Sequence, residues 1–67
     1  MILNNISSLC QKNNISIARL EKTLGIGNGT IGGWDRASPT VSKLKLVADY
    51  FHVTVDDLIR EDVNNGS

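Results

Sequence analysis

Apolar positions recur along most of the chain at the three- and four-residue spacing of amphipathic helices. Such a stripe begins at Ile2 and continues to Cys10, and it predicts a first helix near residues 2–12. Ser16 is a good N-cap residue, and the apolar positions that follow it predict a second helix over residues 17–24. Gly25 then stands where a glycine in the left-handed conformation would end that helix.

The pattern continues through the second half of the chain. Ile31 and Trp34 are three residues apart and would share one face of a third helix over residues 28–35. Pro39 disfavours helical geometry at the residue before it, so a loop should follow the third helix.

Two further helices are predicted after this loop. Thr40 is a suitable N-cap for a fourth helix, whose inner stripe consists of Leu44, Val47, Ala48 and Phe51. Thr54 and Asp57 have the spacing of a capping box at the start of a short fifth helix. We therefore expect an all-α, five-helix domain over residues 1–62, and a flexible tail or the start of a linker over residues 63–67.

Leu46 and Tyr50 fall outside the stripe of the fourth helix. Either they form a small exposed apolar patch, or they pack beneath the fifth helix or the tail.

Composition narrows the class of protein further. A chain of 67 residues with 40% hydrophobic residues can build one small core. Cys10 is the only cysteine, so neither an internal disulfide nor a zinc site with His52 can be formed. No apolar run approaches transmembrane length, and the N-terminus has no basic segment of the kind that begins a signal peptide. We therefore expect a cytoplasmic protein without a membrane partner.

The stretch from Gly27 to Gly32, GNGTIG, matches the glycine pattern G-x-G-x-x-G of dinucleotide-binding loops. That chemistry requires a buried strand that runs into a tight turn and a helix. The preceding segment is helical by its spacing, and nothing in the chain resembles a buried strand. No cofactor and no small-molecule substrate are therefore expected, and because no motif places a nucleophile, base or metal, the protein is not expected to be an enzyme.

Two short helices joined by a glycine-bearing turn are instead typical of a helix-turn-helix. The segment from Ile17 to Trp34, IARLEKTLGIGNGTIGGW, resembles the helix-turn-helix of the Cro/C1-type family of phage and bacterial transcriptional regulators. The flanking segments ISSLCQKNNISI and SPTVSKLKLVADYFHVTVDDLI resemble the family's first helix and its fourth and fifth helices. The resemblance covers about residues 2–60 and is close to repressor-like proteins of low-GC Gram-positive bacteria and their phages.

This resemblance implies a compact, lambda-repressor-like domain that binds double-stranded operator DNA without a cofactor. Members of the family usually dimerise, so a homodimer is implied as well. The chain would be either a complete Cro-like protein or the DNA-binding domain of a longer repressor.

If residues 28–35 enter a major groove, the residues that face outward meet the base edges first. Because Ile31 and Trp34 face inward, the candidates for base contact are Asn28, Gly29, Thr30, Gly32 and Gly33. Asn28 could bond an adenine edge and Thr30 could bond a base or touch a thymine methyl group. Alternatively, Asn28 caps the third helix and Thr30 bonds to the backbone of its first turn.

Phosphate contacts are expected from helix N-termini and the polar residues around them. The hydroxyl candidates are Ser16, Thr40 and Ser42, and the basic candidates are Arg36 and Lys43. The alternative for each basic residue is a solvated surface charge.

The zero net charge and the glycine at position 33 leave open a second function, the binding of a protein instead of DNA. The net charge is zero, although residues 12–45 carry six basic against two acidic residues and residues 49–62 carry five acidic against one basic. Gly33 stands where relatives commonly place arginine or lysine, and Glu21 stands where many carry a small alanine. Either the glycines let the third helix approach DNA closely, or Gly33 marks a lost contact and the domain binds a protein, as an antirepressor binds a repressor.

Overall fold

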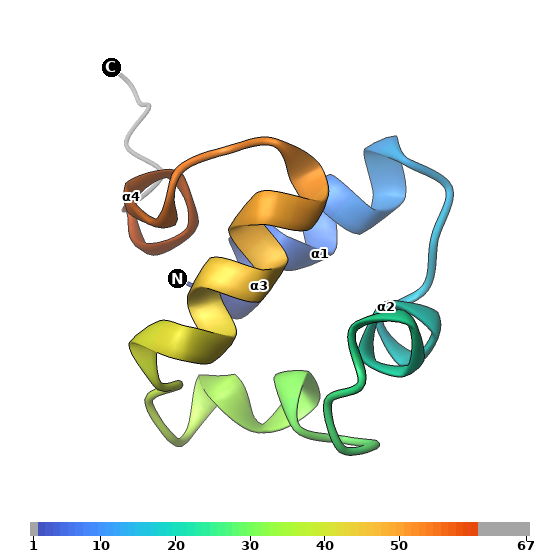
Figure 1. Ribbon diagram of the computed structural model, residues 1–67, viewed down its shortest axis with the longest axis horizontal. Helices are drawn as coiled ribbons and strands as arrows, with labels where there is room; N and C mark the ends of the chain where they lie inside the picture. The colour runs from blue at the N-terminus through green and yellow to red at the C-terminus, as the bar shows by residue number, and fades with distance from the viewer. Residues whose placement is uncertain (1, 61–67) are drawn as a thin grey trace.

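The computed structural model describes residues 2–60, which form four α-helices and one short 3-10 helix, with no strand in this range (Figure 1). The all-helical prediction is thereby confirmed for the described residues. The elements in order are α1 (Ile2–Lys12), α2 (Ile17–Leu24), η1 (Ile31–Asp35), α3 (Val41–Phe51) and α4 (Val55–Ile59). The predicted tail, residues 63–67, lies outside the described residues.

The predicted helix starts are confirmed by their capping bonds. The Ser16 hydroxyl accepts the backbone N–H of Arg19 at 3.0 Å, and the Thr40 hydroxyl accepts that of Lys43 at 3.2 Å. Each bond satisfies an N–H that has no partner within the helix, so it fixes the residue at which the helix begins.

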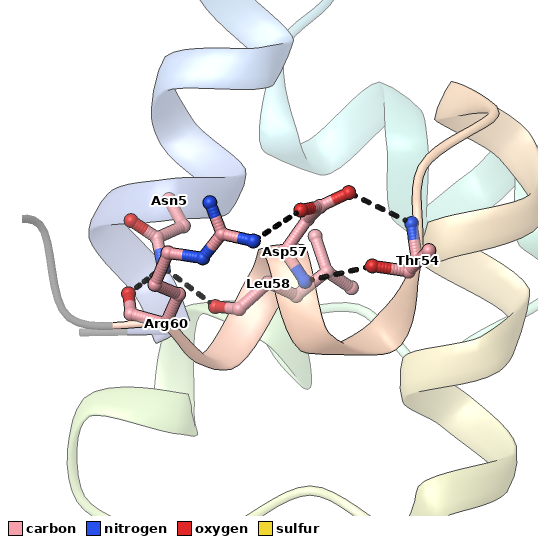
Figure 2. Close-up of polar contacts among 5 residues, drawn as sticks. All are labelled: Asn5, Thr54, Asp57, Leu58 and Arg60. Atoms are coloured by element: carbon pink, nitrogen blue, oxygen red, sulfur yellow. Dashed lines mark hydrogen bonds and ion pairs between the residues drawn. The ribbon is translucent and has the colours of Figure 1, made fainter.

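The capping box at the start of α4 is also present (Figure 2). The Thr54 hydroxyl accepts the Asp57 N–H, and an Asp57 carboxylate oxygen accepts the Thr54 N–H, both at 3.0 Å. These two bonds account for the formation of a helix as short as five residues.

The predicted bounds of the third helix are wrong. Residues 28–30 form a turn, and only Ile31–Asp35 are helical, in the tighter 3-10 form. Gly29 has a φ of +86°, which a right-handed helix does not permit, and the Thr30 N–H closes a turn onto the Gly27 carbonyl at 3.0 Å. Since glycine is also a poor helix former, the local sequence does not sustain an α-helix here.

The core is a single cluster that draws on every element. It comprises Ile6, Cys10, Leu20, Ile26, Ile31, Trp34, Leu44, Val47, Ala48 and Leu58. α1 lies at the centre and contacts both η1 and α4, and α3 packs against α4 (Figure 1). The inward placement predicted for Ile31 and Trp34 is therefore confirmed.

A contact that the sequence does not suggest joins the two ends of the described chain (Figure 2). The Asn5 side-chain amide on α1 donates to the carbonyls of Leu58 and Arg60 at 2.7 and 2.8 Å. It thereby satisfies backbone acceptors at the end of α4, where a helix has no partners of its own.

Leu46 and Tyr50 on α3 are 45% and 38% exposed, so α4 does not bury them. The alternative that they pack beneath the tail lies outside the described residues. His52 ends α3 in the left-handed conformation with a φ of 59°. None of the described helices is both long enough and apolar enough to cross a membrane.

Candidate nucleic-acid interface

The end of α2 sets the path of the chain toward η1. Gly25 adopts a φ of 72°, and its N–H bonds to the Lys22 carbonyl at 3.2 Å. The Ile26 N–H bonds to the Glu21 carbonyl at 2.9 Å, which completes a Schellman motif. Because Ile26 is buried at the same point, the chain reverses tightly and returns η1 to the side of α2.

The Glu21 side chain on α2 bonds to the backbone of the turn that precedes η1, a role that the sequence did not predict. Its side chain is 2% exposed. One carboxylate oxygen accepts the Gly29 N–H at 2.9 Å, and the other accepts the Ile31 N–H at 2.7 Å. These partners are eight and ten residues away, and no local motif of the sequence joins them to Glu21.

This geometry explains the G-x-G-x-x-G pattern. In a nucleotide-binding loop the backbone N–H groups that such glycines expose would bind a phosphate. Here two N–H groups of the glycine-rich turn bind the carboxylate of Glu21 instead. The pattern thus belongs to a loop that binds an anion of its own chain.

The candidates for base contact lie together on the turn and on η1. Asn28, Gly29 and Gly32 are exposed, while Thr30 and Gly33 are half-buried. Asn28 does not cap η1, because the N-cap position belongs to Thr30, and the Thr30 side chain makes no capping bond. The alternative roles considered for these two side chains are therefore absent, and both polar groups remain available to a partner.

The glycines of η1 are not required by packing inside the chain. A Cβ atom placed on Gly32 or Gly33 meets no atom within 4 Å. Among Gly29, Gly32 and Gly33, only Gly29 has a backbone conformation that disfavours a side chain. Gly32 and Gly33 consequently leave backbone uncovered on the outer side of η1.

Most candidates for phosphate contact continue from η1 onto α3. Arg36 is 90% exposed at its side chain, and its guanidinium lies 4.0 Å from the Asp35 carboxylate. Thr40, Ser42 and Lys43 are exposed at the start of α3. We call the combined set the 28–43 surface; it comprises Asn28, Gly29, Thr30, Gly32, Gly33, Arg36, Thr40, Ser42 and Lys43.

Ser16 is separate from this surface. It lines a hollow together with Asn13, Arg19 and Tyr50, and Tyr50 lies at the C-terminal end of α3. Thr40 caps the opposite end of α3, roughly 16 Å away along an 11-residue helix. The predicted site is thus divided between two ends of α3.

The charges around the 28–43 surface are mostly exposed and weakly paired. Lys45 lies 3.7 Å from Asp49, an exposed pair on α3 that contributes little to stability. In Figure 1, α4 lies at the upper left of the view and η1 lies at the bottom. At α4, the Thr54 backbone N–H, the Thr54 hydroxyl and the Arg60 guanidinium lower the pKa of Asp57.

Cys10 offers no reactive group. It is buried in the core, and this burial raises the pKa of its thiol. Since the thiolate is the nucleophilic form, Cys10 behaves as a small apolar core residue.

The described residues thus form a small all-helical domain with an exposed polar turn held by a buried carboxylate. Comparison with family models, curated proteins and solved structures found no match to the chain.

Proposed function

We propose that this protein is a transcriptional regulator of the Cro/C1 type, which binds double-stranded operator DNA through the 28–43 surface. In this proposal α2, the turn and η1 act as a helix-turn-helix, with the turn and η1 in the major groove. One observation carries the proposal. The turn of residues 28–30 and η1 are held on their inner side by Ile31, Trp34 and Glu21, and their outer side is open and carries few side chains.

The chemistry of the exposed groups fits this role. An asparagine amide can donate to and accept from an adenine edge, and a threonine offers both a hydroxyl and a methyl group. Asn28 and Thr30 would supply these contacts, while Arg36 and Lys43 would neutralise phosphates beside the groove. The uncovered backbone at Gly32 and Gly33 allows a close approach between η1 and the duplex.

Ser16 would contact the backbone at a distance from the other candidates. The N-terminus of α2 combines its hydroxyl with a helix dipole, which favours an anion.

A second function is favoured by a specific feature of η1. No basic side chain lies within Ile31–Asp35, and the nearest one, Arg36, sits beside an aspartate. Together with the zero net charge, this suits a domain that binds another protein, for example a repressor whose DNA-reading surface it covers.

Titration of the protein with a fluorescent random-sequence duplex separates the two functions. A DNA-binding protein that neutralises two phosphates, here with Arg36 and Lys43, should lose roughly twelve-fold in affinity between about 50 and about 200 mM salt. We expect measurable binding at the lower concentration and a loss of this order at the higher one. Absence of binding at both concentrations would overturn the DNA proposal and favour a protein partner.

A further inference from the structure

Glu21 is the only charged side chain buried among residues 2–60. Burial of a carboxylate is costly unless hydrogen bonds replace the lost water, and Glu21 obtains these bonds from the backbone of the turn. An apolar residue at this position would leave the Gly29 and Ile31 N–H groups without these acceptors. The carboxylate therefore does more than fill space between α2 and η1.

The two donors define what the carboxylate fixes. Gly29 follows Asn28 directly, and the N–H groups of Gly29 and Ile31 bracket Thr30. Both side chains proposed to contact bases are thus attached to backbone that Glu21 holds. Charge-assisted bonds of this kind are about twice as strong as neutral ones.

The turn has little else to order it. Three of the six residues from Gly27 to Gly32 are glycine, the residue with the greatest backbone freedom. Its backbone bonds run from the Thr30 N–H to the Gly27 carbonyl, and from the Gly33 N–H to the carbonyls of Gly29 and Thr30. Without the carboxylate, the turn would sample several conformations, and the two side chains would lose their fixed relation.

We propose that Glu21 is a positioning residue that determines the selectivity of this protein for one DNA sequence over others. This inference rests on the proposed DNA-binding function and adds a residue that never touches the DNA. Glu21 holds Asn28 and Thr30 in one arrangement, while the phosphate contacts of Arg36 and Lys43 do not depend on it. Loss of the carboxylate should therefore reduce sequence-specific binding and leave nonspecific binding in place.

Glu21→Gln tests this separation, because glutamine has nearly the same shape but only one acceptor oxygen. Its amide NH2 would face the second backbone N–H, donor against donor. Asp56→Asn is the matched control, since it makes the same change of charge at an exposed position on α4. Wild type is first used to select a preferred duplex from a random library, and dissociation constants are then measured for this duplex and for a random one.

We expect Glu21→Gln to weaken binding of the selected duplex about tenfold or more while binding of the random duplex is retained. Asp56→Asn should change both affinities by the same factor and preserve their ratio. A ratio in Glu21→Gln equal to that of wild type would overturn the inference. If Glu21→Gln does not fold, Glu21→Ala replaces it, because a small side chain lets water reach the two N–H groups.

Amide hydrogen exchange tests the role of Glu21 independently of whether the protein binds DNA. If wild type binds neither duplex, the DNA-binding proposal fails, and exchange still decides whether Glu21 orders the turn. Exchange at Gly29 and Ile31 should then be about tenfold faster in Glu21→Gln than in wild type, with Asp56→Asn unchanged. Unchanged exchange at both amides would overturn the role assigned to Glu21.

Discussion

At the scale of single residues, Gly33 bears most directly on whether the partner is DNA. It is half-buried on η1, and a Cβ atom added there meets no neighbouring atom within 4 Å. A lysine there would add one positive charge next to the proposed groove.

We predict that Gly33→Lys raises DNA affinity and steepens the dependence of log K on log salt by about 0.9, the effect of one added phosphate contact. Fluorescence titration of a random duplex at several salt concentrations measures both quantities. Gly33→Gln is the control, because it adds a side chain of similar reach without a charge. Loss of binding in both variants would instead indicate that the duplex approaches the bare backbone too closely to admit a side chain.

Glu21 illustrates which residue roles the sequence could not reveal. Asn28 and Thr30 were expected to face outward from the spacing of Ile31 and Trp34, but that spacing assumed a helix over residues 28–35, and residues 28–30 form a turn. The partners of Glu21 depend on a chain reversal at Gly25 and on the left-handed conformation of Gly29. The spacing of residues in the sequence does not predict these two backbone conformations, so it does not predict the role of Glu21 either.

At the scale of elements, the four α-helices lie where the sequence predicts helices, whereas η1 replaces a predicted α-helix. The α-helices that follow α1 begin at side-chain caps, Ser16, Thr40 and Thr54, whose effect is confined to one turn of helix. The third helix was predicted from two apolar residues alone. Since three glycines accompany them, packing of Ile31 and Trp34 fixes the position of η1 but not its helical form.

The capping box of α4 predicts a dependence of stability on pH. Because hydrogen bonds from Thr54 lower the pKa of Asp57 in the folded state, the folded protein binds this proton less tightly than the unfolded chain does. The resulting stability is fully present above the ordinary pKa of an aspartate, roughly 4, and is lost as the pH falls through the lowered value. The wild-type midpoint of thermal unfolding should therefore decrease as the pH falls below about 4.

Asp57→Asn should lower the midpoint at neutral pH and show a smaller decrease on acidification, as measured by circular dichroism. Asp56→Asn is the control, because its side chain lies on the same helix but outside the capping box. An acid-induced decrease as large in Asp57→Asn as in wild type would show that other carboxylates account for it.

At the scale of the whole molecule, the small core brings η1 and the acidic α4 against the same helix, α1. α1 joins them, since it packs on η1 and its Asn5 amide binds the end of α4. In the proposed complex, the duplex would meet the side that carries Arg36 and Lys43.

The salt dependence of DNA binding in single-residue variants tests this account most directly. We predict that Arg36→Ala and Lys43→Ala each weaken binding of a random duplex and reduce the slope of log K against log salt by about 0.9. Arg60→Ala removes the same charge from the end of α4 and should leave the slope unchanged. Wild-type slopes in both Arg36→Ala and Lys43→Ala would contradict the account, because they would exclude the 28–43 surface from the DNA interface.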